Sequence, residues 1–123
     1  AKGPAGNVVP MECDLASLSS IRKFAAEWKG LGKTLDVLVC NAGVSLNTAT
    51  KPPAPRTADG FELTVGTNHL GHFLLSLLLL PELEKAPGSP RLVVTASQVH
   101  DPTSAGGNVG SKATLGGLEG LKK

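Results

Sequence analysis

The stretch LDVLVCNAG, residues 35–43, joins a short apolar run to a small polar turn. Leu35–Cys40 is bounded by turn-forming residues, which predicts a strand buried on both faces of a parallel sheet. Arg91–Ala96 (RLVVTA) repeats the pattern and predicts a second buried strand. Asn7–Cys13 (NVVPMEC) predicts a further strand at a sheet edge, because Pro10 cannot donate a hydrogen bond to a ladder.

Helical periodicity fills the two intervals between these strands. In the first interval apolar residues recur at steps of three and four, which predicts an amphipathic helix that begins after Ser17. In the second, a longer helix is expected from about Ala58 to Lys85, with Thr57 as its cap and a kink or division at Pro81. Alternating strands and helices favour a parallel α/β sheet with right-handed crossovers. The first helix carries the apolar stripe Leu18, Ile21, Ala25 and Trp28 and ends at Gly30 and Gly32.

Composition argues against several classes of function. The chain has 123 residues, a formal net charge of +2 and no concentrated basic patch, so nucleic-acid binding is not expected. Its longest apolar run, Phe73–Leu80, is shorter than the roughly 20 residues of a membrane span. Cys13 and Cys40 are expected to be free thiols, too few for a disulfide framework. His69 and His72 lie one helical turn apart without further convergent ligands, so no metal site is predicted.

Polar or small residues stand where each predicted strand ends. Asp14 follows the first strand, Asn41-Ala42-Gly43 the second and Ser97 the third. Ligands of such sheets bind beyond the carboxyl ends of the strands, so these positions are candidate site residues. Each also has a structural interpretation: a helix cap or turn at Asp14, a tight turn at Gly43 and a loop start at Ser97.

Asn68 is a further candidate, because asparagine is a poor helix former and lies here inside the long predicted helix. Gly66 and Gly71 flank it and weaken the helix further. This clustering indicates either a close packing contact or a backbone carbonyl put to use. The glycines could equally serve only to admit a neighbouring strand.

These residues, in this order and spacing, resemble the short-chain dehydrogenase/reductase family over nearly the whole chain. The resemblance implies an NAD(P)-binding, Rossmann-like α/β domain with flanking helices. It implies that Asp14 contacts the adenine ring, that Asn68 holds a water in a proton-relay chain, and that Ser97 orients the substrate. It also implies cofactor-binding roles for Leu15, Asn41, Ala42 and Gly43.

Four longer stretches resemble a narrower branch of that family, the light-dependent protochlorophyllide reductases. This branch implies NADPH as cofactor, protochlorophyllide as small-molecule substrate, light-driven reduction to chlorophyllide, and a plastid location with peripheral membrane association as an option. Gly43 departs from the alanine that is frequent in the branch, so a resemblance to retinol-dehydrogenase-like members of the family stays an alternative. The stretches are MECDLASLSSIRKF (11–24), LVCNAGV (38–44), GFELTVGTNHLGHFLL (60–75) and GNVGSKATLGGLEGL (107–121), the last where the branch carries an insertion.

The chain lacks two parts that a complete short-chain reductase is expected to have. It contains no tyrosine, so the Tyr-x-x-x-Lys acid is absent, and no Gly-rich phosphate-binding turn follows a first strand. We therefore interpret residues 1–123 as an internal, partial domain that is inactive by itself. Its core elements lie in 1–100 and a Gly-rich loop or insertion in 101–123. Two alternatives stay open: another short-chain reductase acting on a ketone, aldehyde or retinoid, and a non-catalytic remnant or binding scaffold.

Overall fold

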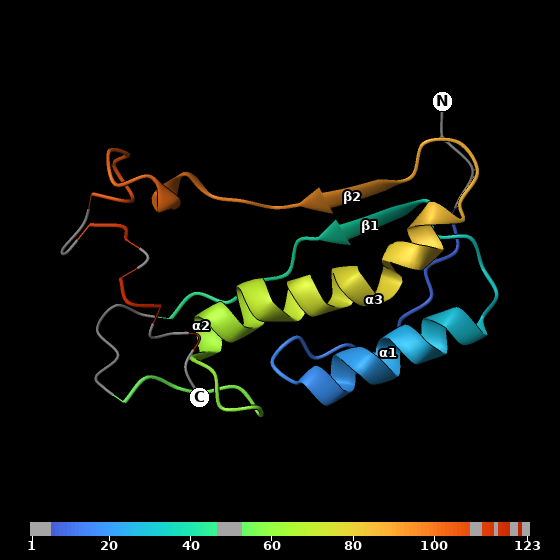
Figure 1. Cartoon of the computed structure of the whole chain (residues 1–123), viewed down its shortest axis with the longest axis horizontal. Coiled ribbons are helices and arrows are strands. Elements are labelled where there is room, and N and C mark those ends of the chain that lie inside the picture. Colours follow the sequence, from blue (N-terminus) through green and yellow to red (C-terminus); the bar gives the residue numbers. More distant parts are fainter. Residues whose placement is uncertain (1–5, 47–52, 109–111, 115, 119–120, 122–123) are drawn as a thin grey trace.

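A long helix lies along one face of a short parallel sheet, with a second helix packed beside it (Figure 1). The computed structural model describes residues 6–46, 53–108, 112–114, 116–118 and 121. The elements are α1 (Leu18–Gly30), β1 (Val37–Cys40), α2 (Leu63–Val65), the π-helix η1 (Gly66–Gly71), α3 (His72–Glu84), β2 (Arg91–Val94) and the 3-10 helix η2 (Gln98–His100). Strands β1 and β2 pair in parallel, with Val37 opposite Arg91 and Cys40 opposite Val94.

Helix α1 has the cap and the apolar stripe expected from the sequence. The Ser17 hydroxyl accepts a hydrogen bond from the backbone N–H three residues on at 3.3 Å, which confirms Ser17 as the N-cap. Ile21 is fully buried and Ala25 is 2% exposed, so the stripe faces the core. The helix ends at Gly30, and Gly32 has a φ of +60°, a conformation that glycine adopts without strain.

A distant loop adds a second cap to α1. The Asp59 carboxylate accepts the Leu18 backbone N–H at 2.8 Å, and the Ala58 N–H donates to the Ala16 carbonyl at 3.0 Å. A negative charge at this end of a helix also complements the helix dipole. The loop before the second helical segment is thereby tied to the start of α1, across 41 positions of sequence.

We expect Asp59→Ala to lower the free energy of unfolding by about 1 kcal/mol, the usual loss when a helix cap is removed. Asp59→Asn keeps an oxygen that can accept the Leu18 N–H and removes only the charge, so its loss should be smaller. Urea unfolding measures both variants. Asp36→Ala removes an exposed carboxylate elsewhere in the chain and is the control. Equal losses in all three variants would contradict the capping role of Asp59.

The second helical segment begins at Leu63 rather than Ala58, and the expectation that Thr57 caps it is wrong. Thr57 instead closes a turn: its N–H donates to the Phe61 carbonyl at 2.8 Å, and its hydroxyl accepts the Phe61 N–H at 3.2 Å. Glu62 is the N-cap, because its two carboxylate oxygens accept the N–H groups two and three residues on. A carboxylate that satisfies two N–H groups displaces the start of the helix to its own position.

The Glu62 cap should make the stability of the fold depend on pH. Burial raises the pKa of this carboxyl, but hydrogen bonds from the Thr64 and Val65 backbone lower it by more, so the net pKa lies below its ordinary value of 4.5. The cap therefore stabilises the fold above 4.5, and its contribution is lost as the pH falls through the folded-state pKa.

We therefore expect Glu62→Gln to be less stable than the unchanged chain at neutral pH, because glutamine can offer only one oxygen to the two N–H groups. The difference should shrink as the pH falls well below 4.5, where the native carboxyl is protonated. Urea unfolding over a range of pH measures it. A difference that stays constant with pH would contradict the assignment of Glu62 as a charged cap.

From Leu63 to Glu84 the chain stays helical, although it passes from α-helix to π-helix and back. Pro81 does not divide α3. Figure 1 shows the C-terminal turns of α3 angled away from the rest of the helix, as a proline inside a helix predicts. By length and composition alone the segment could cross a membrane. However, Leu75, Leu79 and Leu83 belong to the cluster that packs against α1, so one face of the segment is part of the core. The rest of the segment is more exposed than the buried helix expected from the sequence.

Three expectations about the strands are wrong. Asn7–Cys13 forms no strand, and Val8 within it is 92% exposed. Val37 and Val39 of β1 are 50% and 56% exposed, and every residue of β2 is exposed, so neither strand is buried on both faces. Both strands are also shorter than expected, at four residues each. Within the described residues the sheet has two strands, with helices on one face only, so its other face stays exposed (Figure 1). Residues 7–13 do not pair with either of these two strands.

The stretch after β2 is a loop, as expected. Residues 101–108 form a succession of turns. Ser104 holds them together, because its hydroxyl lies 2.8 Å from the carbonyls of Gln98 and Asp101 and accepts the Gly107 N–H at 3.0 Å. The turn of helix expected near residues 115–121 falls largely outside the described residues.

Candidate functional site

Asn68 lies in the π-helix η1 and fastens a loop to it. Its side-chain oxygen accepts the Val44 N–H at 2.8 Å, and its side-chain nitrogen donates to the Val44 carbonyl at 2.8 Å. The amide thus pairs with both backbone groups of one residue, as a neighbouring strand would. Short π-helical turns are rare in proteins, and those that occur are frequently found at functional sites. The poor helix former noted in the sequence therefore has a specific partner.

The glycines on either side of Asn68 admit close neighbours. A Cβ on Gly71 would lie 2.5 Å from the carbonyl oxygen of Leu15, and a Cβ on Gly66 would collide with the methyl group of Thr57. The packing interpretation of Gly66 and Gly71 is confirmed, with loops rather than a strand as the neighbours. Together with the Asn68 amide, they make η1 the meeting point of three loops.

The carboxyl ends of β1 and β2 are joined by a side-chain contact as well as by the ladder. Thr95 donates its hydroxyl to the side-chain oxygen of Asn41 at 2.9 Å and its N–H to the last carbonyl of β1 at 3.0 Å. Beyond Asn41, both Ala42 and Gly43 are exposed. A Cβ on Gly43 would lie 3.3 Å from the Asn68 side-chain oxygen. Residues 41–46 are irregular, so the tight turn considered for Gly43 is not observed. The segment of residues 41–44 is an exposed surface that is held from two sides.

Ser97 follows β2 and begins η2. Its hydroxyl accepts the Val99 N–H at 3.3 Å, and its carbonyl oxygen lies 2.5 Å from Nδ1 of His100. These contacts support the loop-start interpretation, and no hydrogen bond among the described residues joins Ser97 to Asn68. The side chain is exposed beyond the end of β2, and its role toward a substrate stays a prediction.

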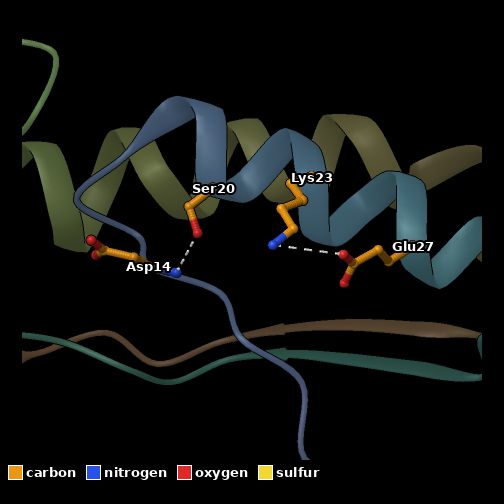
Figure 2. A network of polar contacts seen from close by, with 4 residues as sticks. All are labelled: Asp14, Ser20, Lys23 and Glu27. Carbon is orange, nitrogen blue, oxygen red and sulfur yellow. Dashed lines mark hydrogen bonds and ion pairs between the residues drawn. The ribbon is translucent and has the colours of Figure 1, made fainter.

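Asp14 organises the turn that leads into α1 (Figure 2). Its carboxylate accepts the Ala16 N–H at 2.8 Å, and its own N–H donates to the Ser20 hydroxyl at 3.0 Å. Figure 2 shows the carboxylate pointing away from Ser20, while Lys23 and Glu27 form a 3.9 Å ion pair further along α1. That pair is exposed and contributes little to stability. The turn interpretation of Asp14 is confirmed, and its contact with adenine stays a prediction.

The neighbours of Asp14 face inward. Leu15 is half-buried and packs against the hydrophobic core. Burial raises the pKa of the Cys13 thiol and the Asp14 charge raises it further, which keeps the thiol protonated at neutral pH. Cys13 and Cys40 are both free thiols; Cys40 is buried and Cys13 is half-buried. In the part of the chain that the structure describes, no three His, Cys, Asp or Glu side chains could share a metal ion.

The structure brings some of the candidate residues together and leaves others apart. Gly43 meets Asn68 just after the end of β1, and the turn at Asp14 and Leu15 reaches the same π-helix through Gly71. Asn41 is held separately, by the Thr95 hydroxyl. Ser97 stands separately on the loop after β2.

Sequence reasoning missed three residues of this site. Val44 and Thr95 gave no signal, because Val44 acts through its backbone and Thr95 lies inside a predicted strand. His72 gave a signal that was available: it follows Asn68 by four positions, the spacing at which a helical side chain reaches a preceding carbonyl. Its Nδ1 lies 3.0 Å from the Asn68 carbonyl oxygen.

An apolar hollow of about 290 Å³ adjoins Asn68 between the helical segment and β2. Phe73 and Leu77 on its wall are 57% and 53% exposed, so this face of α3 is uncovered in the described chain. Its further lining includes His69, Leu80, Leu92 and Val94.

Comparison with known proteins identifies the class. Residues 1–119 match the short chain dehydrogenase family, and the chain belongs to that family. An uncharacterised protein from Mycobacterium paratuberculosis, known from its crystal structure, superposes with a TM-score of 0.57 and 44% identity. The superposition covers 73% of this chain and 28% of that protein. The α/β, Rossmann-like fold class expected from the sequence is confirmed, in incomplete form.

Within the family, the chain is similar to protochlorophyllide reductases. It is 51% identical over 119 residues to the chloroplastic protochlorophyllide reductase of Chlamydomonas reinhardtii, which covers 96% of this chain and 30% of the relative. It is 53% identical over 116 residues to that of Cucumis sativus, which covers 94% of this chain and 29% of the relative. The chain therefore spans about 30% of the length of these relatives, and the resemblance to this branch is confirmed.

Proposed function

We propose that the protein to which this chain belongs reduces protochlorophyllide to chlorophyllide in a light-dependent reaction with NADPH. The observation that carries the proposal is identity at 51% and 53% of positions, over nearly the whole chain, with relatives named for this substrate. The matched span continues through most of the Gly-rich residues 101–123, which we assign as a loop inserted after the core elements in 1–100. The same proposal gives the protein a plastid location, with peripheral association to a membrane as an option.

The cofactor would lie along the edge where the strands end. There Asn41, Ala42 and Gly43 are exposed, and the closeness of Gly43 to Asn68 leaves little room for a side chain on the inner side. Residues as small as Ala42 and Gly43 offer mainly backbone to a ligand, which fits the flat surface of a nicotinamide nucleotide. Asp14 and Leu15 would contact the adenine end. A reduced nicotinamide bound here supplies a hydride.

Asn68 and Ser97 would be the catalytic residues that this chain contributes. The Asn68 amide is committed to Val44, so a water for proton relay would bind its backbone carbonyl, which has a second lone pair beside the contact with His72. The Ser97 hydroxyl accepts from Val99 and can still donate its own hydrogen to a substrate oxygen.

A chimera tests the proposal, because this chain has no tyrosine and spans about 30% of its relatives. Residues 1–119 would replace the matching segment of the Chlamydomonas reinhardtii enzyme. We expect the chimera to convert protochlorophyllide to chlorophyllide only when NADPH and light are both present, as followed by the absorption of the pigment. Ser97→Ala in the chimera should slow turnover, whereas Ser45→Ala, an exposed serine outside the proposed site, should not.

The alternative functions give different results in the same assay. A chimera that binds NADPH and leaves the pigment unchanged in light, but reduces a ketone, aldehyde or retinoid, would overturn the substrate assignment. A folded chimera that binds no NADPH would support a non-catalytic scaffold. The 123-residue chain by itself should neither bind NADPH tightly nor reduce the pigment, because it contains no tyrosine and no Gly-rich phosphate-binding turn.

A further inference from the structure

His72 is a buried histidine whose ring is turned back onto the π-helix. It is the first residue of α3 and only 9% of its surface is exposed. Its backbone N–H donates to the His69 carbonyl, three residues back. Its ring Nδ1 lies 3.0 Å from the Asn68 carbonyl oxygen, four residues back. One residue therefore contacts the carbonyls of two adjacent residues in the region where the helix changes type.

The contact between His72 and Asn68 fixes the tautomer of the imidazole. A backbone carbonyl oxygen can only accept a hydrogen bond, so Nδ1 must carry the proton. In the neutral ring this leaves the lone pair on Nε2. Protonation of Nε2 would leave the Nδ1–H donor in place, so the bond holds in both charge states of the ring.

His72 contacts the same Asn68 whose side-chain amide binds the segment of residues 41–44 after β1. The Asn68 amide makes both of its hydrogen bonds to Val44, and Gly43 packs against the same amide. Movement of the Asn68 backbone would therefore shift both contacts at once. We infer that His72 is a positioning residue: its Nδ1–H fixes the Asn68 backbone and thereby holds the segment of residues 41–44 in place.

The neighbouring histidine provides a contrast. His69 is exposed, and its ring stacks on Phe73 with centroids 6.3 Å apart and an interplanar angle of 20°. The two histidines are three positions apart in one helical segment, yet His72 alone is buried beside Asn68. His69→Phe keeps an aromatic ring against Phe73 and is the matched control for a change at His72.

Hydrogen exchange in this chain tests the inference without any enzymatic activity. The Val44 amide reports on the grip of Asn68, and the Thr95 amide, bonded to the carbonyl of Cys40, reports on the sheet. His72→Phe should speed exchange at Val44 by about tenfold relative to Thr95, the change that loss of one ordinary hydrogen bond gives. His72→Asn places an amide N–H near the position of Nδ1 and should keep the ratio within about twofold.

Two outcomes would overturn the inference. Equal acceleration at Val44 and Thr95 in His72→Phe would mean that His72 only supports the fold. A ¹⁵N spectrum with the proton of the neutral His72 ring on Nε2 would remove the bond to Asn68 altogether. His69→Phe should leave both amides and the spectrum of His72 unchanged. If His72→Phe does not fold, the ¹⁵N spectrum of the unchanged chain still decides.

If the proposed function holds, residues 41–43 contact the cofactor, and a change at His72 should then weaken cofactor binding. In the chimera, His72→Phe should raise the KM for NADPH about tenfold while kcat changes less than about twofold, the pattern of weakened cofactor binding. His72→Asn should restore the KM, and a kcat loss without a KM change would contradict the link to this segment. If the chimera lacks activity, the proposed function fails, and the exchange ratio still tests the positioning role.

Discussion

Gly71→Ala should lower the free energy of unfolding by about 1–3 kcal/mol, the usual cost of forcing an extra carbon into a packed interior. The added Cβ would lie 2.5 Å from the carbonyl oxygen of Leu15, a backbone atom that cannot swing aside. Helix propensity works in the opposite direction, because alanine is favoured over glycine by roughly 1 kcal/mol. The clash prevails because relieving it requires the Asp14–Leu15 turn to move away from η1, together with the half-buried Leu15 side chain.

Gly30→Ala is the matched control, because it makes the same change in a helix where nothing lies within 4 Å of the new Cβ. Its stability should be unchanged or higher by at most about 1 kcal/mol. Urea midpoints of the two variants give the comparison. If Gly71→Ala is as stable as Gly30→Ala, the turn at Leu15 does not press on η1, and the π-helix does not join the loops.

Features set by local chemistry could be predicted from the sequence. Ser17 caps α1 as expected, and the apolar stripe of α1 faces the core. Both features could be predicted because a cap and a helical period depend on residues within a few positions of each other. The second helix shows the limit of this reasoning. Thr57 and Glu62 are both residues that can cap a helix, and only the tertiary turn that ties Thr57 to Phe61 decides between them.

Burial of the strands could not be predicted from the same local pattern. Arg91–Val94 has the apolar composition of a covered strand, yet every residue in it is exposed, because burial depends on what packs against the strand. Asn7–Cys13 illustrates the same point for pairing: its sequence suits a strand, and the described chain gives it no neighbour. Composition indicates what a segment suits, whereas the layers around it decide what it becomes.

The candidate site was predictable in its members more than in its connections. The anomaly of an asparagine between two glycines pointed to Asn68, and the structure gives it a partner in Val44. No property of the Val44 side chain predicts that the Val44 backbone will be hydrogen-bonded by an amide 24 positions away. His72 was overlooked because a histidine pair invites a metal interpretation before a hydrogen-bonding one.

Asn68→Asp should strongly lower the proposed activity, because it changes one donor into an acceptor without changing the shape of the side chain. One carboxylate oxygen can still accept the Val44 N–H, but the other would face the Val44 carbonyl oxygen across the 2.8 Å that a hydrogen bond now spans. Two oxygens without a hydrogen between them repel. The carboxylate must therefore rotate away from Val44, and the segment of residues 41–44 loses its contact with residue 68.

In the chimera, Asn68→Asp should lower kcat/KM by about 100-fold, which corresponds to the loss of two hydrogen bonds of roughly 1–1.5 kcal/mol each. Asn68→Ala should lower it by a similar factor, because it removes the same two bonds without adding charge. Asn7→Asp adds the same charge at an exposed position outside the site and should leave kcat/KM unchanged. Steady-state rates with varied NADPH would measure these effects. If Asn68→Asp retained more than about a third of the activity, the Asn68–Val44 pair would not hold the edge of the sheet where the cofactor is proposed to bind, since the loss of one hydrogen bond of about 1 kcal/mol already lowers a rate about fivefold.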